Sequence, residues 1–469
     1  MGDMETEKKA RFRKFTQGYT FKIFLLIFLV LLLLIPLMMI RSLINERNRT
    51  AVSAEEGIME AWGSELFAAG PVIAIPGIRT EEFITRSDKE GEKAEINKTP
   101  FTFIITPEKL EISANLRTET RKRGIFSVPL FSGDLSFSGV FNPKAALSSL
   151  LPNEEVSLNQ AELVIVLSSQ KGIRKIGQAA WGSSELFFQP GCRGLNIFRT
   201  AGQSGPWYSS SSQSNSGIYA VIPNFTNTES SFNITIAIQG GQLVRFLPMG
   251  QDTHAAVNAD WVSPSFQGSF LPASSNITAS GFDAAWDISY LSRDIPLYWK
   301  NESGDNNRVD YSNSFFGVNF FRAIDTYSLN TRAVKYAILF LIVPFLTLFL
   351  LEVFTHKRIH PVPYLLSGIA NIIFYLLLLS LSEQMQFYLA YLIAAFAVVA
   401  LLTLYSRSLL PSWNKSWYMG FVVLISYVLL YAVLNAESYA LLIGSIGAFV
   451  VVALVMFLTR RLDWYGSDE

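Results

Sequence analysis

Cysteine and histidine are scarce in this 469-residue chain, and their scarcity excludes several kinds of site. A single cysteine, Cys192, leaves no internal disulfide framework and no cysteine-based zinc site. The three histidines, His254, His356 and His360, are too few and too scattered to indicate a metal centre in a soluble domain. Cys192 is therefore interpreted as a small packing residue, with a reactive thiol as the alternative.

Charge is also scarce. Charged residues make up 16% of the chain, against about 25% in ordinary globular proteins. The formal net charge is zero, so no global basic field indicates nucleic acid as a partner. Apolar residues reach 50% and the mean hydropathy is positive, which together predict a membrane protein.

Common catalytic and cofactor-binding motifs are missing. Neither GxxxxGK[ST] nor GxGxxG occurs, so no phosphate-binding loop is predicted. A Ser-His-Asp hydrolase in the central region would need His254 as its base, but no G-x-S-x-G elbow accompanies it. His254 is interpreted as an exposed loop residue. No catalytic, cofactor-binding or metal-binding residue is predicted, and the chain is not expected to be an enzyme.

The N-terminal region predicts a membrane anchor. A basic tail over residues 1–22 precedes a continuous apolar run over 23–40, IFLLIFLVLLLLIPLMMI. At about 1.5 Å per residue this run nearly spans the hydrocarbon core. Charged residues follow the run directly, and no small-x-small cleavage site lies close behind it. We therefore predict an uncleaved first transmembrane helix. Residues 41–69 keep helical spacing and are predicted to form a stalk.

Residues 70–332 have the composition of a β domain. Short runs such as GPVIAIPGI, FTFIITP and AELVIVLSS are rich in β-branched and aromatic residues and are separated by Gly, Pro, Asn and Ser. This pattern is typical of antiparallel strands in a sandwich or barrel. SVPLFSG at 127–133 resembles SPSFQG at 263–268, which favours two related halves, 70–200 and 218–330.

The chain returns to lipid in a five-helix block over 333–458. The predicted spans are 333–354, 362–382, 386–405, 417–434 and 439–458. Lys and Arg occupy the connections that share a side with the N-terminus, and the opposite connections contain none. The predicted fold class is therefore an α-helical six-span membrane protein with a large extracytoplasmic all-β domain between spans one and two. Both termini, including the tail 459–469, are predicted to be cytoplasmic, and residues 41–332 periplasmic.

Six polar residues of this block are candidates for function. Asn371 is the deepest strongly polar residue of any span, and intramembrane polar residues are often functional. Glu352 and His356 are four residues apart, at helical i, i+4 spacing, and His360 follows four residues later. Two interpretations remain, a metal site and a charged cluster at the membrane interface. Glu383 and Glu437 are either neighbours on the outer surface or two separate solvated loop carboxylates.

Several ordered blocks resemble the CreD family of bacterial inner-membrane proteins. They are IPLMMIRSLINERNRT (35–50), GPVIAIP (70–76), PSFQGSFLP (264–272), SGFDAAW (280–286), TRAVKYAIL (331–339), RIHPVPYLLSG (358–368), FYLLLLSLSE (374–383) and LTRRLDWY (458–465). The resemblance implies an N-terminal anchor, a periplasmic domain and a C-terminal membrane block. It also implies a role in cell envelope integrity and stress response. Raised levels of such proteins are linked to colicin tolerance and an altered β-lactam response. It carries no established catalytic residues.

Three mechanistic classes remain open from the sequence. The chain is a structural or interaction protein, a transporter or lipid-handling protein, or a membrane enzyme that uses Glu352 and the histidines. Its expected partners are the lipid bilayer and an envelope protein or lipid bound by the periplasmic domain, and a homo-oligomer is left open.

Overall fold

The computed structural model describes residues 19–87, 91–193, 195, 216–302, 311, 313–320, 326–355, 358–409, 413–436 and 439–460. The chain divides into two compact units. One consists of Met1–Val52 and Ile324–Glu469, and the other is Ser53–Ala323. The first is helical and the second is β-rich, so a large all-β region lies in the sequence between the first apolar helix and the later helices, as predicted.

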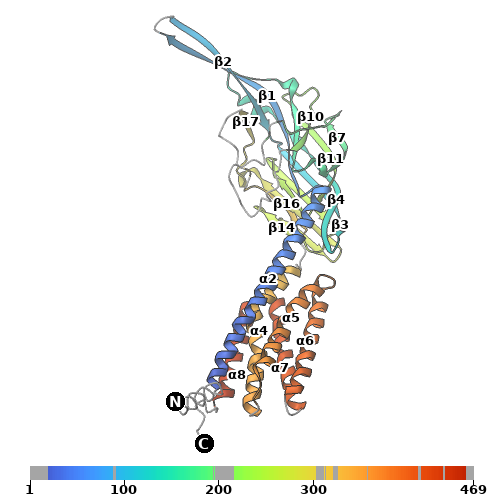
Figure 1. The fold of residues 1–469 in the computed structure, drawn as a ribbon. Coiled ribbons are helices and arrows are strands. Elements are labelled where there is room, and N and C mark those ends of the chain that lie inside the picture. The colour runs from blue at the N-terminus through green and yellow to red at the C-terminus, as the bar shows by residue number, and fades with distance from the viewer. Residues whose placement is uncertain are drawn as a thin grey trace. The chain divides into compact units, whose positions relative to one another are not determined.

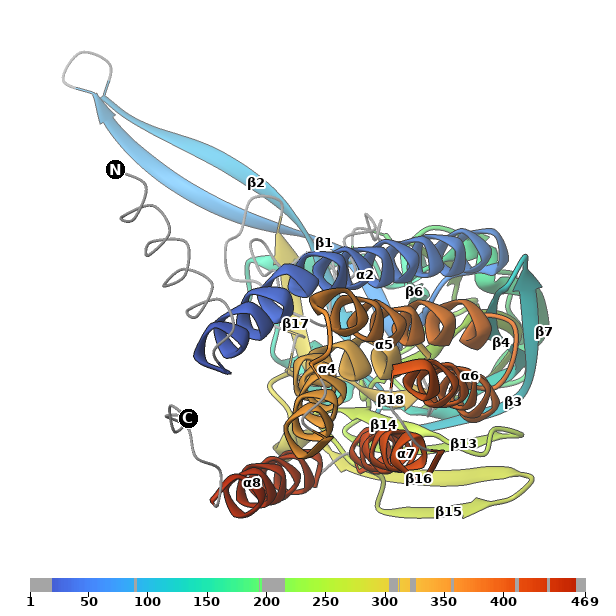
Figure 2. The same ribbon diagram turned by 60° about the horizontal axis from the view of Figure 1, so that its bottom comes forward.

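The helical unit, here called the helical block, contains most of the first helix, α2 (Tyr19–Trp62), and five helices near the C-terminus. The latter are α4 (Thr326–Thr355), α5 (Pro361–Ser382), α6 (Phe387–Leu409), α7 (Trp413–Asn435) and α8 (Ala440–Thr459). Helix α4 packs against α5 and α7, α6 packs against the same two helices, and α8 packs against α7 (Figures 1 and 2). Consecutive helices run antiparallel because the connections between them are short.

Five helices are long and apolar enough to cross a membrane within the described residues. They are Phe21–Trp62, Thr326–Thr355, Pro361–Ser382, Phe387–Leu409 and Ser416–Asn435. In α8 the described residues give a shorter apolar helix, Leu442–Leu454. The predicted count of six spans therefore stays a prediction.

Helix α2 is longer than the predicted anchor. It begins at Tyr19, so Lys22 is helical rather than part of a tail, and it continues to Trp62. Gly63 and Ser64 then take positive φ angles of 152° and 57°, and their N–H groups both donate to the carbonyl of Met59. Such a left-handed ending is a common helix C-terminus. Strand β1 starts at Leu66, four residues before the predicted domain boundary at 70.

The β-rich unit has two sheets (Figure 1). The ten-stranded sheet contains β1 (Leu66–Ser87), β2 (Gly91–Ile105), β5 (Glu154–Val156), β6 (Glu162–Leu167), β9 (Gln189–Pro190), β10 (Ser216–Val221), β12 (Leu243–Leu247), β14 (Ser265–Gly268), β17 (Tyr298–Glu302) and β18 (Phe316–Asn319). The eight-stranded sheet contains β3 (Lys109–Arg123), β4 (Phe126–Phe141), β7 (Ile173–Trp181), β8 (Ser184–Glu185), β11 (Ser230–Gly241), β13 (Asp252–Ala259), β15 (Ser274–Thr278) and β16 (Gly281–Ser289). A short helix, α3 (Lys144–Ser148), follows β4.

Both sheets contribute to one apolar core. In β3 the side chains of Leu110, Ile112 and Ala114 are buried while the residues between them are exposed, which is the alternation expected of a strand with one face in water. They join residues of the first sheet, such as Ile73 and Ile75, in a single buried cluster. The two sheets therefore stabilise each other through their facing apolar sides.

Strands from both predicted halves pair directly. Strand β1 pairs in parallel with β12, and β3 pairs in parallel with β13. Of the two similar segments, 127–133 lies in β4 of the eight-stranded sheet, and 263–268 leads into β14 of the ten-stranded sheet. The relation between the halves stays a prediction, and in the structure they interleave in one unit.

A charged cluster stabilises the ten-stranded sheet where β1, β5 and β17 lie close together. The side chain of Glu154 is fully buried, and its carboxylate accepts hydrogen bonds from Arg79 Nε at 3.0 Å and Lys300 Nζ at 2.5 Å. The backbone N–H of Leu151 donates to the same carboxylate at 2.9 Å. Burial alone would raise the pKa of Glu154, but these three hydrogen bonds outweigh it and hold the pKa below its usual value.

Replacement of this carboxylate tests the cluster. Glu154→Gln should lower the free energy of unfolding at pH 7 by about 3 kcal/mol, because it leaves Lys300 without its anion and leaves Arg79 with Glu302 alone. The pKa of Glu154 is lower in the folded state than in the unfolded state, so its stabilisation is present above about pH 4.3 and is lost as the pH falls through the folded pKa.

The measurement is urea unfolding of the full chain in detergent, followed by tryptophan fluorescence from pH 7 to pH 3. Glu155→Gln, at the exposed neighbouring position, is the matched control and should leave stability unchanged. A deficit of the same size at every pH would contradict the assigned role of Glu154.

Candidate functional site in the helical block

Helices α4 and α5 are joined by buried polar contacts at three levels along their length. The contacts lie at the α4–α5 connection, in the middle of the two helices, and at the opposite end. Each level involves a residue that the sequence singled out, namely Glu352, Asn371 or Glu383. Polar groups in an apolar surrounding are costly unless they are paired, so these contacts decide how the helices pack.

The first level is an ion pair with a tyrosine. Glu352, near the end of α4, is 4% exposed, and one of its carboxylate oxygens accepts a short hydrogen bond from Lys22 Nζ of α2. The other oxygen accepts from Tyr364 Oη of α5 at 2.7 Å. Lys22 Nζ also donates to the backbone carbonyl of Ile359 at 2.8 Å and lies 5.3 Å from the centre of the Tyr364 ring. Three helices and the connection before α5 therefore meet at one carboxylate.

The second level compensates for a proline. Pro344 lies inside α4 and has no N–H, so the carbonyl of Phe340, four residues earlier, loses its helical donor. Asn371 Nδ2 of α5 donates to that carbonyl at 2.8 Å. Asn371 Oδ1 in turn accepts from Tyr427 Oη of α7 at 2.6 Å. The deepest polar residue predicted from the sequence thus links α4, α5 and α7.

Aromatic residues surround the second level. The ring of Phe374 lies 4.4 Å from that of Tyr427 and 5.4 Å from that of Tyr391 of α6, measured between centroids. Tyr391 Oη donates to the backbone carbonyl of Tyr427 at 2.6 Å. Tyr375 is also buried, and its hydroxyl has no hydrogen-bond partner among the described residues. The centre of the block is therefore aromatic and partly polar, which its apolar sequence does not suggest.

The third level lies at the other end of α4 and α5. Asn330 Nδ2 of α4 donates to Ser382 Oγ of α5 at 2.9 Å, and both residues are buried. Tyr327 Oη donates to Glu383 Oε1 at 3.2 Å. Glu383 is the C-cap residue of α5, and the bond from Tyr327 joins its half-buried carboxylate to α4.

The remaining predicted site residues have other positions. His360 is the N-cap of α5, and its Nδ1 accepts from the N–H of Val362 at 3.4 Å, a long contact at a helix that begins with proline. His356 and Glu437 lie outside the described residues, so the Glu352–His356–His360 metal hypothesis and the Glu383–Glu437 pairing stay predictions. Within the described residues, no group of three His, Cys, Asp or Glu side chains is placed to hold a metal ion.

Sequence reasoning missed the partners of these residues. Lys22 was one of several basic residues near the N-terminus, and nothing local marks it as the partner of a carboxylate 330 positions away. Tyr364 and Tyr427 lie within apolar runs, where tyrosine is common. One signal was available, because Pro344 inside a predicted span implies an unpaired carbonyl at Phe340 that a neighbouring helix must satisfy.

Comparison with known proteins assigns the family. The sequence profile described as "Inner membrane protein CreD" matches residues 18–465. The chain belongs to the CreD family. Inner membrane protein CreD of Escherichia coli (strain K12) is 30% identical to it over 440 residues, which cover 93% of this chain and 91% of that protein. The resemblance to CreD proteins predicted from the sequence blocks is confirmed.

A solved structure adds nothing to this assignment. An M1 zinc metallopeptidase from Deinococcus radiodurans aligns with a TM-score of 0.20 and 10% identity, over 39% of each chain. A likeness this weak carries no argument about the fold or function of this CreD-family protein.

The bond between Asn371 and the Phe340 carbonyl gives a coupled prediction. Asn371→Leu should destabilise the block by about 2 kcal/mol, because it leaves the Phe340 carbonyl and the Tyr427 hydroxyl unpaired. In a Pro344→Ala background the cost should be smaller, because the new N–H at position 344 can satisfy that carbonyl. A double-mutant cycle of thermal unfolding in detergent measures the difference. Equal costs in both backgrounds would exclude the proposed link, and Asn435→Leu, at an exposed position of α7, is the control.

The ion pair gives a second prediction. Lys22→Met alone should destabilise the helical block by about 3 kcal/mol, because it leaves the buried carboxylate of Glu352 without its positively charged partner and with the Tyr364 hydrogen bond alone. The double variant Lys22→Met/Glu352→Met should recover most of that loss, since well-packed apolar residues can replace a buried ion pair. Thermal unfolding of the native chain, of Lys22→Met, of Glu352→Met and of the double variant in one detergent tests this. If the double variant loses the sum of the two single losses, the two residues are not partners.

Proposed function

We propose that this chain is a multi-span protein of the bacterial inner membrane that supports the integrity of the cell envelope. In this proposal the membrane is crossed six times, both termini are cytoplasmic, and residues 41–332 form a periplasmic β sandwich or barrel. Family membership supports the membrane assignment. The distribution of Lys and Arg between alternate connections supports the orientation.

The observation that carries the mechanism is the set of three polar levels between α4 and α5. The buried groups Glu352, Asn371 and Asn330 each bond to a neighbouring helix. A block tied at both ends and in the middle is suited to holding a fixed arrangement of helices. We therefore assign the binding role to the β-rich unit and a supporting role to the helical block, with no catalytic step. The proposed partners of the protein are the lipid bilayer and a component of the cell envelope.

A second candidate is a transporter or lipid-handling protein, and one observation favours it. Tyr375 lies one turn from Asn371 on the same side of α5, and its hydroxyl has no hydrogen-bond partner among the described residues. Polar groups inside a membrane often mark the path of a substrate or ion. In this alternative the five C-terminal helices form the path for the substrate, and the β-rich unit has a supporting role.

An experiment with a foreign anchor separates the two candidates. Residues 1–40 are replaced by an unrelated single transmembrane helix and the chain is ended after Ala323, which retains the whole β-rich unit. In cells that lack the native protein, the hybrid should restore survival under colicin or a β-lactam to within about twofold of the full chain, because the binding unit is intact.

Two controls complete this test. Immunoblotting and resistance of the β-rich unit to added protease establish that the hybrid is present and folded. The full chain with Asn371→Leu at wild-type abundance should still protect. If the folded hybrid fails to protect and Asn371→Leu also abolishes protection, the helical block is the active part and the transport alternative replaces the proposal.

A further inference from the structure

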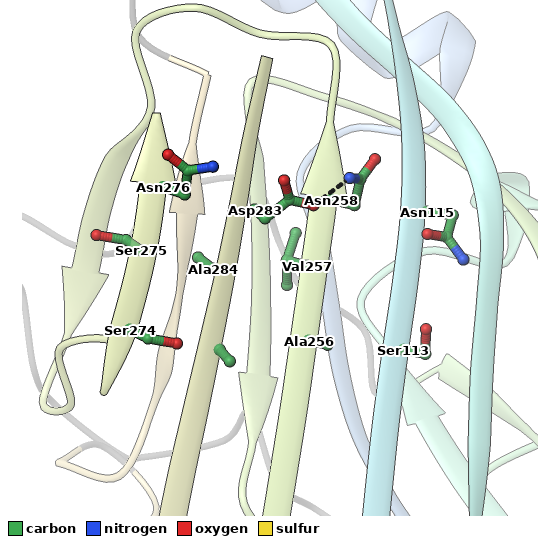
Figure 3. A pocket seen from close by; sticks show the side chains of 11 residues that line it. Ser113, Asn115, Ala256, Val257, Asn258, Ser274, Ser275, Asn276, Asp283 and Ala284 are labelled. Carbon is green, nitrogen blue, oxygen red and sulfur yellow. Dashed lines mark hydrogen bonds between the residues drawn. The ribbon is translucent and has the colours of Figure 1, made fainter. Parts of the chain in front are cut away.

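A groove of about 270 Å³ lies on the outward face of the eight-stranded sheet (Figure 3). Four neighbouring strands, β3, β13, β16 and β15, form its floor and walls. Its polar lining residues are Ser113, Asn115, Asn258, Ser274, Ser275, Asn276 and Asp283. None of these residues belongs to the site in the helical block.

The strand register places four of these side chains in one line across the sheet. Asn115 is opposite Asn258, Asn258 is opposite Asp283, and Asp283 is opposite Asn276. Figure 3 shows the four side chains in this order. Neighbouring strands are about 4.8 Å apart, so the line covers roughly 14 Å at right angles to the strands. We refer to these four residues as the amide row.

A second line runs parallel to the amide row, two residues along each strand. It consists of Ser113, Ala256, Ala285 and Ser274. The two alanines are the small residues in its middle, and they form the floor of the groove. A flat ring can therefore lie against the sheet beside the amide row.

The amide row is free to bind because the core is built from the other face of the same strands. Asn115, Asn258, Asp283 and Asn276 are exposed, whereas Ala114, Val257 and Ala284 next to them are buried. Asn258 Nδ2 donates a short hydrogen bond to Asp283 Oδ1. The other amide and carboxylate atoms of the row can still donate to or accept from a ligand.

The charges of the lining select the kind of ligand. Asp283 is the single ionised group, and the lining contains no Lys, Arg or His. Phosphate groups and other anions are normally held by Arg, Lys or helix N-termini, so they do not fit this groove. Amides and hydroxyls instead match an uncharged ligand with many hydroxyl and amide groups.

We propose that the amide row binds an uncharged, extended polysaccharide that lies across the strands, with its pyranose rings against the alanine floor. The length of one β-linked pyranose unit is close to the spacing between strands, so successive sugars meet equivalent side chains on successive strands. The inference rests on the proposed function, in which the β-rich unit binds a component of the envelope. It names the glycan chain as that component.

A peptide strand added to the edge of the sheet is the main competing ligand. Strand β15 is at the edge, and Ser274–Thr278 are all exposed. An added strand would lie beside β15, however, and it would contact the side chains of β15 and β16 while leaving Asn115 and Ser113 on β3 without a role. The extent of the groove over four strands therefore favours the glycan.

The test uses the full chain in a detergent without a sugar headgroup, and the tetramer of β-1,4-linked N-acetylglucosamine as the probe. Titration calorimetry should show saturable binding. Asn258→Ala should weaken it by about tenfold, because it removes a central member of the amide row. Ala285→Leu should weaken it comparably, because it fills the floor and leaves every hydrogen-bonding group in place.

Two control variants make the result specific. Asn233→Ala, exposed on β11 on the same face but outside the groove, should bind like the native chain. Ile277→Pro, on the edge strand but outside the lining of the groove, should leave sugar binding unchanged. The unfolding temperature of each variant is measured alongside.

The proposal is overturned if the native chain shows no saturable binding of the tetramer. It is also overturned if binding is the same in Asn258→Ala and Ala285→Leu as in the native chain, or if Ile277→Pro abolishes it while the other two variants bind normally. If sugar binding fails and the anchored β-rich unit still protects cells, the envelope role stands with a different ligand. If the native chain binds the sugar but the anchored β-rich unit does not protect cells, the sugar-binding proposal holds and the proposed division of roles between the two units is wrong.

Discussion

The absence of water inside a membrane is the constraint on which the helical block depends. Any polar group there must find its partner within the protein, because lipid offers none. Pro344 exposes the carbonyl of Phe340, and Asn371 satisfies it from another helix. Tyr427 then satisfies Asn371. One missing N–H in α4 thus fixes how α5 and α7 are placed against it.

Close packing reinforces the same arrangement. A Cβ at Gly368 of α5 would lie 2.8 Å from the ring of Phe345 in α4 and closer still to Leu33 in α2. Glycine at this position lets α2 and α4 approach α5 more closely than any other residue would allow. The ion pair of Lys22 with Glu352 then secures α2 against the same two helices. Van der Waals contact and polar bonds therefore act on the same three helices.

The sequence predicts elements well when the signal is local. The apolar runs identify α5 to within one residue and α6 and α7 to within four, whereas α4 begins seven residues before its predicted start. The predicted runs GPVIAIPGI and AELVIVLSS coincide with parts of strands β1 and β6. Pairings between distant residues are not local and were missed. The sequence marks Glu352 and Asn371 as unusual, but their partners Lys22 and Tyr427 follow only from the packing of helices. The amide row likewise depends on the register of four strands, which their separate sequences do not encode.

The parallel pairs in the β-rich unit have a consequence for how the protein is made. Leu66 of β1 lies opposite Val244 of β12, and Lys109 of β3 lies opposite Asp252 of β13. Strands β1 and β3 pair with β2 and β4, which directly follow them, but well over a hundred residues separate them from their parallel partners β12 and β13. Contacts so distant in sequence form slowly, and unpaired strand edges are prone to aggregate in the meantime. During biogenesis, the early strands therefore need protection until the last strands have emerged.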